Sequence, residues 1–165
     1  MNKLLISAGA LAATALSTPA FAAATNTATA NATVNIVSPL TLTNNTGLDF
    51  GTVVGPFSGQ TVRISTAGVR NCGGLTCSGT TVSAANFTVS GGTANQALAL
   101  TVDPSVSLTS GANSLTVDLT TDLPTGLVTN ASGGATFGVG GSLAIPAGTS
   151  DGVYSGTFNV QVDYQ

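Results

Sequence analysis

The chain contains no histidine, no tryptophan and no glutamate, and its 165 residues include only three Lys or Arg and six Asp. General acid–base catalysis would have to use aspartate, tyrosine or arginine side chains. We therefore expect no enzyme activity, no catalytic residue and no bound cofactor or metal. The formal net charge of −3 argues against the basic surface of a nucleic-acid-binding protein and against a polybasic lipid-binding patch.

Motifs of catalytic sites are also scarce. No Gly-x-Ser-x-Gly elbow is present. Residues 138–141 read Gly-Val-Gly-Gly, but they lack the lysine and the following helix that a phosphate-binding loop requires. We interpret them as a β-turn. Asp118 and Asp122 could approach a hard cation, yet they lack the loop pattern of a calcium site.

The two cysteines, Cys72 and Cys77, lie five positions apart. A zinc site would need further ligands, and the chain has no histidine. A redox pair would favour Cys-x-x-Cys spacing. In an exported protein the expected outcome is a structural disulfide across a hairpin or loop tip.

Residues 1–22 have the features of a signal peptide: Lys3 near the start, an apolar middle and small residues before Ala22. The apolar run is shorter than the ~20 residues that span a bilayer. We predict cleavage after Ala22, no transmembrane segment after cleavage, and export through the periplasm to the cell surface or the medium. The low charge of the remaining chain suits a protein packed in an assembly better than a freely soluble monomer.

The rest of the chain has the pattern of an all-β fold. Short stretches rich in Thr and Val favour strands, and Gly, Asn, Ser and Pro between them favour turns. We predict a flexible N-terminal segment over residues 23–32 and an immunoglobulin-like β-sandwich of short, mostly antiparallel strands over residues 33–165. The predicted strands cover residues 33–43 (bent at Pro39), 60–65, 81–90, 97–102, 113–120, 135–139, 142–145 and 153–164.

The last of these strands has the strongest alternation. Its apolar positions are Phe158, Val160, Val162 and Tyr164, and polar residues separate them. Alternate side chains of a strand point to opposite faces, so this strand has one buried face. A strand of this kind with no following partner suggests that something else completes the sheet.

Five residues give this region a resemblance to a known family. Tyr164 is next to last, alternating apolar residues precede it, and Gly152 lies fourteen positions from the end, as in subunits of chaperone–usher pili. The resemblance implies an incomplete sandwich, contact of a periplasmic chaperone or a neighbouring subunit with Gly152, Phe158, Val160, Val162 and Tyr164, an outer-membrane usher as a further partner, and self-assembly. In pilus subunits the disulfide joins the first two strands, and the local Cys72–Cys77 loop departs from that pattern.

Two further motif pairs extend over most of the chain. Pro-Leu-Thr-Leu at residues 39–42 precedes Leu-Asp-Phe-Gly at residues 48–51, and Ile-Pro-Ala-Gly at residues 145–148 precedes Asp-Gly-Val-Tyr-Ser-Gly at residues 151–156. In this order they resemble the secreted bacterial β-sandwich family called domain of unknown function 4402, which is similar to spore-coat-U-like and pilus subunits. The resemblance implies the fold; the family has no settled activity.

These observations lead to one hypothesis and one alternative. The hypothesis is a structural subunit of a cell-surface fibre or surface layer, in which the N-terminal segment of one subunit adds a strand to the next. The candidate donor side chains alternate: Ala28, Ala30, Ala32, Val34 and Ile36. They could equally form the first strand of the chain's own sandwich. In the alternative, the protein is a monomeric secreted or surface-displayed binding module of unknown ligand.

Overall fold

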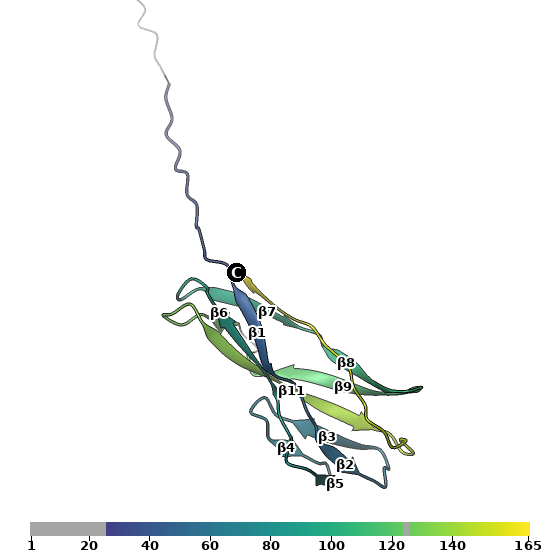
Figure 1. The fold of residues 1–165 in the computed structure, drawn as a ribbon. Coiled ribbons are helices and arrows are strands. Elements are labelled where there is room, and N and C mark those ends of the chain that lie inside the picture. The colour runs from purple at the N-terminus through teal and green to yellow at the C-terminus, as the bar shows by residue number, and fades with distance from the viewer. Residues whose placement is uncertain (1–25, 124–125) are drawn as a thin grey trace, which may run out of the picture. The chain divides into compact units, whose positions relative to one another are not determined.

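The computed structural model describes residues 26–123 and 126–165. The predicted signal peptide and its cleavage site lie outside these residues. A boundary after Val34 divides the chain into two units, and their described parts, residues 26–34 and residues 35–165, are treated separately. Residues 26–34 are exposed and belong to no strand. The second unit is all-β in its described part, which confirms the predicted fold class (Figure 1).

Twelve strands form antiparallel pairs among the described residues. Their bounds are β1 Thr41–Thr46, β2 Thr52–Val54, β3 Gln60–Ile64, β4 Arg70–Asn71, β5 Thr76–Ser78, β6 Ala85–Ser90, β7 Ala97–Val102, β8 Ser105–Ser110, β9 Asn113–Thr121, β10 Leu127–Val128, β11 Ala135–Ile145 and β12 Val160–Tyr164.

The long strand β11 is the centre of a seven-stranded sheet. Its first half pairs with β6, and β6 pairs in turn with the edge strand β1. Its second half pairs with β3 and with β9; β4 extends the sheet beyond β3, and β8 extends it beyond β9. A three-stranded sheet has the order β10-β7-β12, and β2 and β5 form a separate two-stranded ribbon. Together the sheets form an incomplete β-sandwich.

The buried side chains form two clusters on the inner face. The closed cluster lies at the β6 half of β11 and consists of Ala85, Phe87, Val89, Leu98, Leu127, Phe137 and Val139. The groove cluster lies at the β9 half and consists of Phe50, Val62, Ile64, Ala84, Val106, Leu115, Val117, Leu143 and Ile145. Partly buried Leu48, Leu119 and Phe158 pack against both clusters, so the two halves share one continuous apolar interior.

Strand alternation explains most of this burial. In β9, Leu115 and Val117 are buried while Ser114 and Thr116 are exposed, as the period of two requires. The closed cluster has a second layer above it, because Leu98 of β7 is fully buried over Phe87 and Phe137. The rings of Phe87 and Phe137 stack with centroids 5.3 Å apart.

The interpretation of residues 138–141 as a turn is wrong. These residues continue the single strand β11, which replaces the two short strands predicted there. A Cβ atom on Gly138 would collide with the carbonyl oxygen of Thr66, and one on Gly140 with that of Ile64. The glycines therefore allow the backbone after β3 to cross closely over β11, which is another common use of glycine in a strand.

The predicted ends of the first and last strands also need correction. Pairing of the first strand begins at Thr41, and residues 33–40 make no strand pairing. The last strand is regular only from Val160; before it, Ser155 makes a single bridge to Thr109 of β8. Both segments have alternating side chains, but alternation does not show whether a backbone partner is available.

Candidate functional site

A groove with a volume of about 1050 Å³ lies on the groove cluster. Its floor is formed by apolar side chains of β8, β9 and β11, namely Val106, Leu108, Leu115, Val117, Leu143 and Ile145. Four of these positions follow from the alternation of predicted strands. Val106 and Leu108 were missed because serine and threonine surround them in β8, although they too alternate.

One wall of the groove is the segment 47–57, which includes β2. Phe50 is buried at its base, and Val53 is partly buried. Asp49 anchors the start of this wall through two backbone hydrogen bonds with Ser83, of 2.9 and 3.1 Å. The only strand that pairs with β2 in the described part is β5, so the opposite edge of β2 has no strand partner there.

The other wall is the segment 149–158, with Tyr154 and Phe158 directed at the groove cluster. Ser155 exchanges two backbone hydrogen bonds with Thr109, of 2.8 and 3.1 Å. From Gly156 to Phe158 the described backbone makes no strand pairing. This wall therefore leaves main-chain donors and acceptors available beside an apolar floor.

The glycines in this wall serve packing within the chain. A Cβ atom on Gly156 would collide with the carbonyl oxygen of Ser107, and one on Gly152 would meet the side chain of Ser110. Both glycines therefore let the wall lie close against β8. Of the residues predicted to contact a chaperone or subunit, Gly152 thus also has a packing role within the chain.

The structure divides the five predicted contact residues into two groups. Gly152 and Phe158 line the groove. Val160, Val162 and Tyr164 lie on β12 and pack against the closed cluster. Strand β12 pairs with β7 from Val160↔Val102 to Tyr164↔Leu98, and no described strand pairs with its other edge. The predicted one-sided strand is thus present, with its apolar side partly covered by its own chain.

Tyr164 joins three segments at the end of β12. Its hydroxyl accepts a hydrogen bond of 2.8 Å from the Thr93 amide and donates one of 2.7 Å to the Ser38 carbonyl oxygen. The Ser38 amide donates to Oγ1 of Thr93, at 2.9 Å. These bonds fix the point at which the chain enters the sandwich, next to the C mark in Figure 1.

The candidate donor residues belong to no strand. Ala28, Ala30, Ala32, Val34 and Ile36 are all exposed, and Val34 and Ile36 are 82% and 84% exposed.

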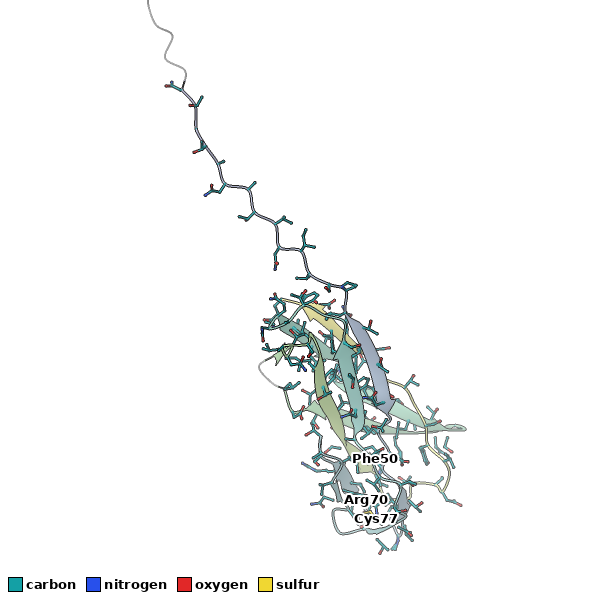
Figure 2. The ribbon with its side chains drawn as sticks, turned by 60° about the vertical axis from the view of Figure 1, so that its left-hand side comes forward. Phe50, Arg70 and Cys77 are labelled. Carbon is teal, nitrogen blue, oxygen red and sulfur yellow. A yellow bond between two sulfur atoms is a disulfide. The ribbon has the colours of Figure 1, made fainter. Side chains whose placement is uncertain are left out.

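The predicted disulfide is confirmed between Cys72 and Cys77, whose Cα atoms are 6.2 Å apart. It lies close to Phe50 and to Arg70, a residue that the sequence analysis did not single out (Figure 2). The Arg70 guanidinium donates to the carbonyl oxygens of Phe50, Ser78 and Gly79 at 3.1, 3.2 and 3.3 Å. Nothing in the local sequence distinguishes Arg70 from the exposed Arg63.

Charge is almost absent from the groove. Among the described residues, Asp49 and Asp151 are its charged lining residues, and Oδ1 of Asp49 accepts a 2.7 Å hydrogen bond from the Gly51 amide. The groove can thus bind through apolar contact and main-chain hydrogen bonds.

No cluster of three His, Cys, Asp or Glu side chains occurs in the described part of the chain. Likewise, residues 26–123 and 126–165 include no helix of the length and apolarity needed to cross a bilayer.

Comparison with known proteins gives a family. The family model described as Domain of unknown function (DUF4402) matches residues 40–164, which include both walls and the floor of the groove. No curated protein matches the chain, and no solved structure matches it. The match covers most of the chain and confirms the resemblance carried by its opening and closing motifs, so the chain belongs to the DUF4402 family.

Proposed function

We propose that this protein is a structural subunit of a cell-surface fibre or surface layer, assembled by addition of a strand from one subunit to the groove of the next. The observation that carries the proposal is the groove itself. It combines an apolar floor with walls that have unpaired backbone in the described part of the chain, at one edge of β2 and in residues 156–158. Peptide strands bind such sites through main-chain hydrogen bonds, and alternate side chains enter the floor.

The occupant we propose is the N-terminal segment of a second copy, residues 26–38. This segment contains no charged residue and no proline, so it matches a groove of low charge, and every residue before Ser38, whose amide bonds to Thr93, has a main-chain amide to offer. Val34 and Ile36 share one face of an extended strand and supply the larger apolar side chains. Matching of the family model begins at residue 40, so the proposed donor precedes the matched domain.

Assembly of this kind requires export. In the proposal, residues 1–22 direct the chain out of the cytoplasm, and the groove and the free edge of β12 contact a periplasmic chaperone before a neighbouring subunit replaces it. An outer-membrane usher would then receive the subunit. Support for these partners is the terminal pattern shared with pilus subunits, together with the unpaired edge of β12.

The decisive experiment uses the chain without residues 1–22 and compares two variants of the donor. Val34→Asp combined with Ile36→Asp places charge on the face that enters the groove, whereas Asn35→Asp places one charge on the opposite face. The wild type and Asn35→Asp should both form ladders of oligomers. These oligomers should resist detergent in the cold and disappear on boiling. We expect their loss in the double variant.

A synthetic peptide of residues 26–38 tests the acceptor separately. It should bind a chain that lacks residues 23–37, and the Val34→Asp, Ile36→Asp peptide should not. Absence of ladders in the wild type together with absence of peptide binding would refute the assembly. A protein that stays monomeric at every concentration while its groove is occupied would instead show that the segment fills the groove of its own chain.

The second candidate function is a monomeric binding module, favoured by the volume of the groove. About 1050 Å³ is close to the upper end of the range for small-molecule pockets, and the floor would suit an apolar ligand. This function predicts a monodisperse protein that does not bind the 26–38 peptide but gains thermal stability with an apolar ligand such as a fatty acid.

A further inference from the structure

In the described part of the chain, no strand pairing joins the β2–β5 ribbon to the other sheets. The ribbon is a two-stranded sheet with three residue pairs, Thr52↔Ser78, Val53↔Cys77 and Val54↔Thr76. Isolated two-stranded ribbons are marginally stable in water. Because β2 is one wall of the groove, whatever holds this ribbon also sets the shape of the groove.

We infer that Arg70 and the Cys72–Cys77 disulfide are the positioning groups of this wall, and that reduction of the cysteine pair weakens strand binding. The inference rests on the proposed function for its binding consequence. Both groups connect the same two parts of the fold: β4, at the edge of the main sheet, and the β2–β5 ribbon.

Arg70 makes the non-covalent connection. Its backbone pairs with Ile64 in the main sheet, and its guanidinium donates to the Phe50 carbonyl oxygen just before β2 and to the Ser78 and Gly79 carbonyl oxygens at the end of β5. Hydrogen bonds from a charged donor are stronger than neutral ones. A Cβ atom on Gly51 would collide with this guanidinium, so the wall and Arg70 are in close contact.

The disulfide adds a covalent cross-link to the short backbone loop that joins β4 to β5. Cys72 directly follows β4, and Cys77 is the central residue of β5, opposite Val53 of the groove wall. The loop between them is held against the main sheet: a Cβ atom on Gly73 would collide with the Thr61 carbonyl oxygen of β3. Leu75 and Cys77 also pack against the groove cluster. Breaking the S–S bond would leave the loop backbone, the hydrogen bonds of Arg70 and the apolar packing of Leu75 to hold the ribbon.

Amide hydrogen exchange at β2 measures how firmly the groove wall is held, with or without a bound peptide. Dithiothreitol reduces the disulfide to two thiols and is itself oxidised to its cyclic disulfide. We expect reduction, or the Cys72→Ser and Cys77→Ser double variant, to speed exchange at Thr52–Val54 by about tenfold, while exchange in β6 and β11 is unchanged. Affinity for the 26–38 peptide should fall by about tenfold in the same samples.

Arginine variants provide the matched control. Arg70→Met should act in the same direction as reduction, Arg70→Lys should recover part of the protection, and Arg63→Met, which removes an exposed charge from neighbouring β3, should have no effect on the wall. Equal exchange at Thr52–Val54 in oxidised, reduced and Arg70→Met proteins would overturn the inference. If the wall loosens as expected but no form binds the peptide, the positioning role stands and the proposed function fails.

Discussion

The hydroxyl group of Tyr164 holds the segment that leads into the sandwich at Ser38. Its ring packs with the closed cluster, while its oxygen bridges the Thr93 amide and the Ser38 carbonyl oxygen. An aromatic side chain with a polar tip suits such a position, between an apolar interior and a solvated rim. In the structure Tyr164 therefore has an internal role, and the edge of β12 beside it has no strand partner among the described residues.

Tyr164→Phe should lower the free energy of unfolding by about 1–2 kcal/mol, because the Thr93 amide loses its partner in a partly buried site. Urea denaturation followed by far-ultraviolet circular dichroism measures the change. Tyr154→Phe is the control, since the Tyr154 hydroxyl donates one exposed hydrogen bond to the Ser150 carbonyl oxygen, at 2.9 Å. Equal effects of the two substitutions would contradict the bridging role of Tyr164.

At the scale of elements, β11 carries the largest difference between sequence and structure. Its alternating residues predicted strands on both sides of Gly140 and Gly141, but the glycines themselves favoured the prediction of a turn. A glycine that permits close backbone approach and one that reverses the chain are identical in sequence. Only the path of residues 64–66 over β11 distinguishes them.

Other elements followed from the sequence to different degrees. Strands β7 and β9 match their predictions closely because Leu98, Leu115 and Val117 alternate with polar residues. The floor and the second wall of the groove were not predictable as a site. They depend on the absence of a neighbouring strand in the described part of the chain. The alternation of residues 153–164 indicates which side chains are buried, but it does not indicate which backbone groups are paired.

Gly140→Ala tests the crossing over β11. We expect a loss of about 1–3 kcal/mol in the free energy of unfolding, because the added methyl group would collide with the backbone of residues 64–66. Gly47→Ala is the control: a Cβ atom there meets nothing within 4 Å, and its effect should stay within about 0.5 kcal/mol. Chemical denaturation measures both. A neutral Gly140→Ala would mean that the crossing segment moves away at little cost.

At the scale of the whole molecule, the low charge has a consequence for assembly. The proposed donor segment is uncharged, and Asp49 and Asp151 are the charged residues on the described lining of the groove. Main-chain hydrogen bonds and apolar burial would then supply the affinity between subunits, and added salt screens neither of them strongly.

Oligomer formation should therefore change by less than about twofold between roughly 0.05 and 0.5 M sodium chloride. Native mass spectrometry or size-exclusion chromatography of the chain without residues 1–22 measures the distribution. The Val34→Asp, Ile36→Asp variant sets the monomer baseline at both salt concentrations. Dissociation of the wild-type oligomers at the higher concentration would indicate ion pairs at the interface and would contradict strand addition as the main contact.

The central strand β11 runs through both apolar clusters. In the described part of the chain the three-stranded sheet covers the closed cluster, whereas the short β2–β5 ribbon and the segment 149–158 flank the groove cluster. We therefore expect the covered half to order first on folding, because it supplies its own tertiary contacts. Since both halves share one backbone, it would also set the register of β11 against β3 and β9. If the proposed strand addition is correct, a donor peptide would then order its own backbone on a floor that is already formed.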